Sequence, residues 1–315
     1  MLYVVGAVTG QELQLPPCWQ TDSGDDPAQF VADIINISDE ELAAVVGCFQ
    51  SNGLTIEHRL VTNQTSSYRL YFKATTAQAW ALFQQLISLA QQCEFDTSVM
   101  PVNIEPIRLL VCDMDSTIVA SETLDDLAEK ANLGERVKEI TTRAMRGEID
   151  FIGALQERVN LLKGVDAKLL QEVITAIKFN SGAEELITTA RQNGIRTVLV
   201  SGGFEAVVAH VAGQLGFDRY VCNQLDVVNG KLSGKVLEPI VDSCTKLQTL
   251  KEECALLGIS TRQSCCIGDG ANDLPMLQEA GVGISYMGKP LLRALLPYQV
   301  NSSDLAYVIS VLGLN

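Results

Sequence analysis

Short apolar runs of strand length alternate with longer amphipathic segments through the second two thirds of the chain. Three runs bounded by polar or glycine-rich residues predict buried strands, at Leu109–Cys112, Thr197–Val200 and Ser264–Ile267. Strands that alternate with helices favour a mostly parallel sheet with helices on both faces. We therefore expect an α/β, Rossmann-like core over residues 106–315, with ligands at the carboxyl ends of its strands.

The first hundred residues follow another pattern. Their alternation predicts strands and helices in the order βαββα, at residues 30–37, 38–53, 54–61, 67–74 and 78–92. Ser38 and Glu41 have the spacing of a capping box at the start of the first helix. This order predicts a small α+β domain of the ferredoxin-like or ACT-like kind over residues 1–105, ending in a linker at Phe95–Glu105.

The segment between the first two core strands is too long for an ordinary crossover. Residues 118–180 are charged, amphipathic and rich in helix-forming residues. We expect them to form a helical cap over the strand ends. Further along, Asn229-Gly230 between two short runs predicts a β-hairpin.

The net charge of the chain excludes some classes of binding partner. The 315 residues carry a net charge of -15, from 23 Lys and Arg against 38 Asp and Glu. Such a chain is repelled by nucleic-acid backbones and anionic membrane surfaces. The start of the chain lacks a basic leader, and no run approaches the roughly 20 apolar residues of a membrane span. We expect a cytoplasmic protein that binds a small molecule, neither nucleic acid nor membrane, and that forms a homodimer.

The number and spacing of the cysteines and histidines limit which metal sites and which catalytic mechanisms are plausible. The nine cysteines show no CxxC spacing, and the only histidines are His58 and His210. Reduced, mostly buried thiols are therefore favoured over disulfides or a zinc site, and any metal should be bound by oxygen. Neither histidine is near a predicted strand end, so hydrolysis through a serine or cysteine nucleophile and a histidine base is disfavoured.

Asp113 and Asp115 follow the first core strand and are the strongest chemical signal in the chain. Alternation along an extended segment sends both side chains to the same side, and two carboxylates that close require a cation or a shared proton. Asp269 follows the third core strand. These residues suit phosphoryl transfer, in which Asp113 attacks phosphorus and Asp115 serves as acid and base. Asp113, Asp269 and the backbone carbonyl of Asp115 would hold Mg²⁺.

The remaining residues of the predicted site lie at the end of the second core strand and before a later helix. Ser201 and the amides of Gly202 and Gly203 would donate to phosphoryl oxygens. Lys246 would supply a fixed positive charge. Asp273 would orient Lys246 or the metal site from behind, without being a ligand.

The ordered strings Asp113-Met114-Asp115-Ser116-Thr117, Ser201-Gly202-Gly203, Lys246 and Gly268-Asp269-Gly270-Ala271-Asn272-Asp273 resemble the four motifs of the haloacid dehalogenase-like phosphatases. Within that superfamily the chain is most similar to the phosphoserine phosphatase family, because of Ser-Gly-Gly-Phe and of the cap segments at 145–151 and 158–162. The resemblance implies Mg²⁺-dependent hydrolysis of O-phospho-L-serine through an aspartyl phosphate on Asp113, the last step of serine biosynthesis.

The resemblance also assigns residues. It implies that Glu122 binds the substrate ammonium and Arg158 the carboxylate, as a zwitterionic substrate requires. Met145 and Phe151 would line the same pocket. Ser201, Gly202, Lys246 and Asn272 would contact phosphate, with Asp113 as nucleophile, Asp115 as acid and base, and Asp269 at the metal. The N-terminal segment shows no glycine-marked effector loop, so amino-acid regulation does not carry over.

Each assignment has a structural alternative. Glu122 could be a first-turn charge on a helix, and Arg158 could pair with Glu157. Met145 and Phe151 could only pack the cap, and the serine-glycine motif could be a turn. Two alternative functions also stand: a phosphotransferase that passes the phosphoryl group to a second alcohol, and an inactive ligand-sensing protein on the same fold.

Overall fold

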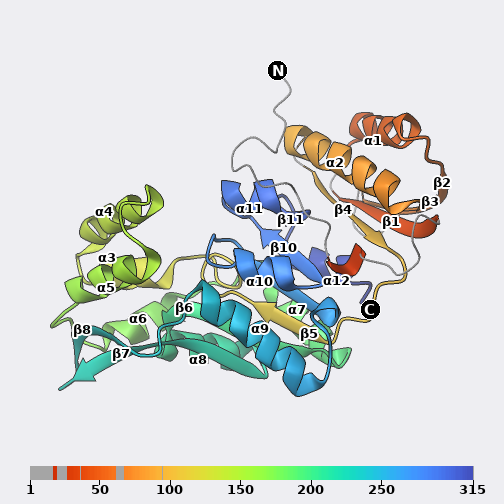
Figure 1. The fold of residues 1–315 in the computed structure, drawn as a ribbon. Coiled ribbons are helices and arrows are strands. Elements are labelled where there is room, and N and C mark those ends of the chain that lie inside the picture. The colour runs from red at the N-terminus through yellow and green to blue at the C-terminus, as the bar shows by residue number, and fades with distance from the viewer. Residues whose placement is uncertain (1–16, 20–26, 36, 62–66, 94, 315) are drawn as a thin grey trace.

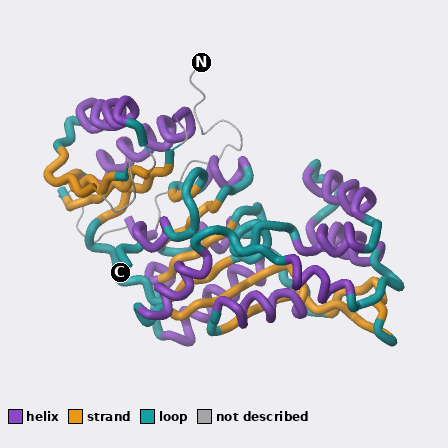
Figure 2. Tube along the Cα trace, turned by 180° about the vertical axis from the view of Figure 1, so that it is seen from behind, coloured by secondary structure: helices purple, strands orange, loops and turns teal. Residues whose placement is uncertain are grey.

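The computed structural model describes residues 17–19, 27–35, 37–61, 67–93 and 95–314. Within them the chain forms two sheets, one of four strands and one of seven. Figure 1 shows the four-stranded sheet at one end of the molecule and a group of helices, α3 to α5, at the other end of the larger sheet. Figure 2 shows the same separation from behind.

The smaller sheet is antiparallel, with strand order β2-β3-β1-β4. Its elements are β1 (Ala28–Ile35), α1 (Asp39–Ser51), β2 (Ile56–Val61), β3 (Tyr68–Ala74), α2 (Thr76–Cys93) and β4 (Asp96–Pro101), after a short 3-10 turn η1 (Pro17–Trp19). The predicted capping box is present at α1, where Ser38 N donates to Glu41 Oε2 at 2.7 Å. The predicted order βαββα is therefore extended by one strand.

The linker predicted at Phe95–Glu105 is wrong in its first half, because residues 96–101 form β4. This strand pairs with β1 and all six of its residues are buried. It lies at the edge of the smaller sheet and packs against β11 (Tyr298–Val300) of the larger one. The sequence of β4 is short and partly polar, so it does not have the pattern of a buried strand. The strand is buried by distant parts of the chain.

The larger sheet has the order β11-β10-β9-β5-β6-β7-β8 and is parallel except for the β7–β8 pair. Its strands are β5 (Leu109–Cys112), β6 (Arg196–Phe204), β7 (Arg219–Val228), β8 (Lys231–Leu237), β9 (Ser264–Gly268), β10 (Val282–Tyr286) and β11. The helices that follow the cap are α7 (Ala183–Gln192), α8 (Glu205–Leu215), α9 (Ser243–Leu257), α10 (Leu274–Glu279), α11 (Pro290–Leu295) and α12 (Tyr307–Val311), with a 3-10 turn η2 (Thr261–Gln263). The predicted α/β core and the hairpin at Asn229-Gly230 are confirmed.

Four helices lie between β5 and α7. They are α3 (Thr123–Lys130), α4 (Gly134–Met145), α5 (Phe151–Leu161) and α6 (Leu169–Ala176). The chain enters and leaves this group through a bridge between Val119 and Phe179, and Asn180 Nδ2 donates to Thr117 O at 2.7 Å. Such a narrow double connection suits the helical cap that we expect over residues 118–180.

The two sheets are joined by polar contacts. The Asp96 carboxylate accepts from the backbone amides of residues 301–303, and Trp19 Nε1 donates to Tyr298 Oη at 2.6 Å. Arg69 pairs with Asp33 at 2.6 Å and also donates to Ser310 O. These contacts attach the N-terminal sheet to β11, to residues 301–303 and to α12.

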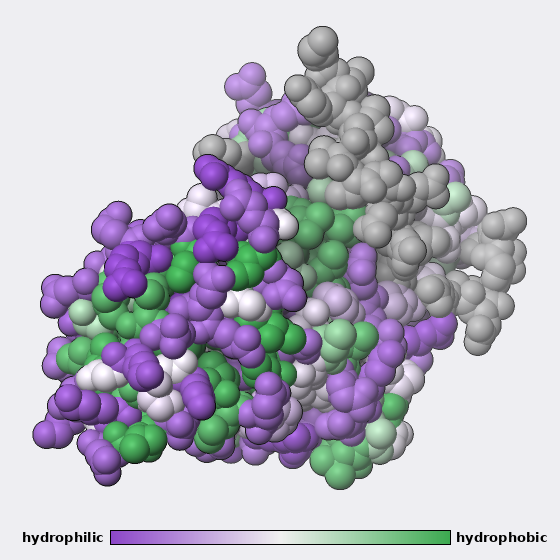
Figure 3. Space-filling model, turned by 60° about the vertical axis from the view of Figure 1, so that its left-hand side comes forward, coloured by the Kyte–Doolittle hydropathy of each residue, from purple (hydrophilic) through white to green (hydrophobic). Residues whose placement is uncertain are grey.

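The surface on the cap side is largely hydrophilic, with apolar residues in separate patches (Figure 3). No helix in the described part of the chain has both the length and the apolar character needed to cross a membrane. All nine cysteines carry free thiols, and four of them are buried.

Candidate active site

Asp113 and Asp115 lie at the carboxyl end of β5, as expected, but they have different partners. Asp113 Oδ1 accepts from the amide of Met114 at 2.7 Å. Asp115 Oδ1 accepts from both the amide and the hydroxyl of Thr123, at 2.8 and 2.7 Å, while its Oδ2 accepts from Ser201 Oγ at 3.0 Å. The Asp115 carboxylate is therefore held by the start of α3 on one side and by β6 on the other.

Lys246 is the fixed positive charge of the site. Its side chain is 1 % exposed, and Nζ lies 2.7 Å from Asp113 Oδ1 and 2.6 Å from Asp273 Oδ1. Burial opposes the charge, but the two carboxylates outweigh it and raise the pKa of Lys246. Burial and then the charge of Asp273 raise the pKa of Asp113, and Lys246 opposes that rise. An ammonium shared between two carboxylates keeps Asp113 in a fixed orientation.

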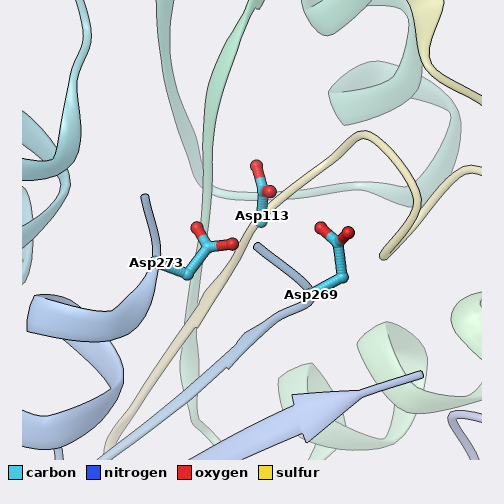
Figure 4. A group of neighbouring side chains, drawn as sticks. All are labelled: Asp113, Asp269 and Asp273. Atoms are coloured by element: carbon cyan, nitrogen blue, oxygen red, sulfur yellow. The ribbon is translucent and has the colours of Figure 1, made fainter. Parts of the chain in front are cut away.

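Three buried carboxylates gather at the ends of β5 and β9. Asp113, Asp269 and Asp273 each place one oxygen within 4.8 Å of the others (Figure 4). Burial raises the pKa of Asp269 to about 6, with Lys289 acting against it. Buried oxygen ligands at this spacing fit a hard divalent cation such as Mg²⁺, which would offset their mutual repulsion.

Asp273 is expected to orient Lys246 or the metal site from behind, and its contacts are consistent with the first of these roles. Its Oδ1 accepts from Lys246 Nζ at 2.6 Å and its Oδ2 accepts from the Gly270 amide at 3.0 Å, while the carboxylate also lies in the acidic group. The Asp115 side chain is outside the group because Thr123 and Ser201 hold it. Only the backbone carbonyl of Asp115 was expected to reach the metal, and that expectation stays a prediction.

The serine-glycine segment belongs to the end of β6. Ser201 Oγ accepts from the amide of Gly203 at 2.8 Å and donates to Asp115. A Cβ atom at Gly203 would lie 3.0 Å from both Asp115 Oδ2 and Ser201 Oγ. Glycine is therefore favoured where β6 passes the Asp115 carboxylate.

The cap brings two expected residues to the same side of the sheet. Phe151 opens α5, and its Cζ lies 3.5 Å from the position a Cβ on Gly202 would occupy. Glu122 precedes α3, and its Oε1 accepts from Ser116 Oγ at 3.0 Å. Glu122 is also close enough to Asp115 to raise the pKa of that carboxyl, after the larger effect of burial.

Arg158 is partly buried in α5, and among the described residues no carboxylate lies within salt-bridge distance of it. The alternative partner, Glu157, pairs instead with Arg143 at 2.9 Å. Burial lowers the pKa of Arg158, while Asp125, Glu122 and Asp115 act in the opposite direction. A guanidinium without a paired carboxylate is available to a carboxylate ligand.

Asn272 lies close to the backbone of its own loop. The side-chain oxygen of Asn272 folds back against Gly270, where it lies 2.4 Å from the position of a Cβ on that glycine. Asn272 shares a loop with Asp269 and Asp273. Met145 ends α4, and its side chain lies outside what the structure describes.

Sequence reasoning missed Thr123, Asp125 and Lys289. Thr123 fixes Asp115, and Asp125 faces Arg158 electrostatically and has a buried Oδ1 without a hydrogen-bond partner in the described structure. Lys289 lies 3.3 Å from Asp269 Oδ2 through its Nζ. Thr123 directly follows Glu122, which was a usable signal, whereas nothing local marks Lys289.

Comparison with known proteins identifies the family of the chain. The family model described as haloacid dehalogenase-like hydrolase matches residues 110–278. A phosphoserine phosphatase of Streptococcus thermophilus is 46 % identical over 204 residues, which are 65 % of this chain and 95 % of that protein.

Solved structures extend the likeness to the fold. A hydrolase of the same family from Salmonella enterica serovar Typhi superposes with a TM-score of 0.80 at 25 % identity, over 89 % of this chain and 97 % of that one. A substrate-bound phosphoserine phosphatase superposes with a TM-score of 0.62 at 33 % identity, over 66 % of this chain and 99 % of that one. With its four motifs around one sheet edge, the chain belongs to the haloacid dehalogenase-like hydrolases.

Proposed function

We propose that this protein is a phosphomonoesterase that hydrolyses O-phospho-L-serine to L-serine and phosphate. The observation that carries the chemistry is the pair Asp113 and Asp115 at one strand end, with the first held by Lys246 and the second by Thr123 and Ser201. The names of the similar phosphatases support the substrate. This reaction would be the last step of serine biosynthesis.

Asp113 attacks phosphorus through one carboxylate oxygen, and the ester P–O bond breaks. Asp115 donates its proton to the departing serine oxygen. In the second half Asp115 takes a proton from water, which attacks the aspartyl phosphate and releases phosphate, so that Asp113 is regenerated. Lys246 and the amides at the end of β6 stabilise the charge on the phosphoryl oxygens.

Asp113, Asp269 and the Asp115 carbonyl would hold Mg²⁺, with Asp273 beside them orienting Lys246. The ion would supply charge neutralisation at the phosphoryl group and make an acidic site tolerant of a phosphate dianion. Family membership and the buried carboxylate cluster support a divalent cation.

Glu122 and Arg158 would select the amino acid by binding its ammonium and carboxylate. Phe151, Met145 and Asn272 would complete the pocket together with Ser201 and Gly202. This assignment is supported by Arg158, which is partly buried and available, and by the position of Phe151 over Gly202.

The acidic, thiol-rich chain suits a cytoplasmic enzyme that acts on a small molecule, without nucleic acid or membrane. We also propose a homodimer, and a division into domains at residues 105 and 106 with the cap at 118–180.

The test is phosphate release from O-phospho-L-serine with and without Mg²⁺, beside phosphoethanolamine and p-nitrophenyl phosphate. We expect Mg²⁺-dependent turnover with a strong preference for phosphoserine. Equal rates on all three substrates would contradict the selectivity. No release from any of them would contradict the phosphatase assignment, and phosphate transferred to an added alcohol would indicate a phosphotransferase.

A further inference from the structure

Lys289 lies in the candidate site but has no part in the proposed chemistry. Its Nζ is 3.3 Å from Asp269 Oδ2 and 3.9 Å from Glu122 Oε1. One ammonium thus connects a buried carboxylate of the core with the first acid of the cap. During the reaction, a metal ion would bind at Asp269 and the substrate ammonium at Glu122. The ammonium of Lys289 lies close to both of these positions.

The backbone of Lys289 is fixed while its side chain has room. Its amide donates to the Asp269 carbonyl at 2.9 Å, and its own carbonyl accepts from the amide of Leu292 at 2.9 Å as α11 begins. The side chain is 52 % exposed, whereas that of Asp269 is 8 % exposed. Lys289 can therefore leave Asp269 through a change of side-chain rotamer, without movement of the loop.

The charge of Lys289 is strongly favoured where it lies. Burial acts against the ammonium, but Asp269 and then Glu122 raise the pKa of Lys289. Without Lys289 the three clustered carboxylates would have Lys246 as their nearest cation. A carboxylate oxygen that already faces an ammonium binds a second cation less tightly, because the two positive charges repel each other.

We propose that Lys289 is a displaceable counter-ion, which holds Asp269 while the metal site is empty and competes with the divalent cation for it. This inference rests on the proposed function only in assigning a cation to Asp269. It makes Lys289 a determinant of metal affinity: the side chain lowers the affinity for Mg²⁺ and stabilises the metal-free site.

The test is titration of Mg²⁺ into the substrate-free protein, followed by isothermal calorimetry at fixed ionic strength. Lys289→Met should bind Mg²⁺ roughly three- to fivefold more tightly than the wild type, the scale expected for removal of a partly exposed ion pair. The matched control is Lys251→Met, which removes a surface lysine 3.6 Å from Glu279. It should leave the affinity unchanged.

A second readout is thermal unfolding. Lys289→Met should melt below the wild type without Mg²⁺, and the difference should shrink at saturating Mg²⁺. Lys289→Gln serves in the same titration if the methionine variant does not fold. Equal or weaker Mg²⁺ binding by these variants, with Mg²⁺ bound by the wild type, would overturn this inference alone. No Mg²⁺ binding by the wild type would overturn the metal assignment of the proposed function as well.

Discussion

At the scale of single residues, the site separates two neighbouring acids by giving them different partners. Asp113 forms an ion pair with the buried ammonium of Lys246. Asp115 instead accepts hydrogen bonds from Thr123 and Ser201, and the negative charge of Glu122 raises its pKa. Burial, followed by Glu122, raises the pKa of Asp115. A raised pKa helps Asp115 to carry the proton that the leaving oxygen needs, whereas the ammonium of Lys246 favours the ionised form of Asp113, as a nucleophile requires.

The pH dependence should respond to Glu122. Activity falls as pH rises through the pKa of Asp115, because the acid loses its proton. Glu122→Gln removes a negative charge that raises this pKa, so the high-pH limb of kcat should move to lower pH. The profile is measured on an alkyl phosphate without an amino group, with the exposed Glu135→Gln as control. A limb that stays in place or moves to higher pH would contradict the coupling.

Substrate selectivity should depend on Arg158. Arg158→Ala should raise KM for phosphoserine by about tenfold or more, because the carboxylate loses a charged hydrogen-bond partner. KM for p-nitrophenyl phosphate, which lacks a carboxylate, should change little. Steady-state kinetics on both substrates decide the matter, and equal increases would remove Arg158 from the carboxylate site.

At the scale of elements, strand ends and helix starts deliver the reactive groups. β5, β6 and β9 end at the same edge of the sheet, and α9 begins at Ser243, three residues before Lys246, with Asp242 as its N-cap. The Asp242 carboxylate accepts from the amide of Thr245 at 2.8 Å. The first turn of α9 therefore depends on a local cap.

Loss of that cap should be measurable as stability. Asp242→Ala should lower the free energy of unfolding by about 1 kcal/mol, the usual effect of removing an N-cap side chain. Asp242→Asn keeps the acceptor and is the matched control. Urea denaturation followed by circular dichroism measures both. Identical losses in the two variants would show that the cap does not stabilise α9.

The parts that could be predicted from sequence are those encoded locally. The short apolar run before Asp113 and Asp115 predicts both the strand and the convergence of the acids, and the capping box predicts the start of α1. β4 could not be predicted, because Asp96 and Ser98 within it are paired with residues some two hundred positions away. Lys289 was missed for the same reason: only the packed sheet brings it to Asp269.

At the scale of the whole molecule, the smaller sheet is fastened to the end of the larger one. Asp96 is 1 % exposed and accepts from three consecutive amides, at 2.7 Å from Asn301 and 2.6 Å from Ser303. These amides immediately follow β11. Both tryptophans, Trp19 and Trp80, lie in the N-terminal part, so their fluorescence reports on that side of the junction.

Removal of this carboxylate should uncouple the two sheets. Asp96→Ala removes a buried carboxylate that accepts from three backbone amides and should lower the free energy of unfolding by about 2 kcal/mol, the scale of hydrogen bonds to a charged group. Tryptophan fluorescence should then change at lower urea than circular dichroism does, whereas the two should coincide in the wild type. Glu57→Ala, at a partly exposed carboxylate of the same sheet, is the control. Coincident transitions in Asp96→Ala would contradict the role of this junction.

The central claim is that Asp113 is the nucleophile, and its direct test is to trap the phosphorylated enzyme. The wild type is mixed with phosphoserine and Mg²⁺, quenched in acid during turnover and reduced with borohydride, and the peptides are analysed by mass spectrometry. The account predicts homoserine in place of Asp113, because borohydride reduces an aspartyl phosphate to homoserine with release of phosphate. Asp113→Asn should show no such conversion, and its kcat should fall by roughly 10⁴-fold or more. Homoserine in place of Asp115, or substantial turnover by Asp113→Asn, would contradict it.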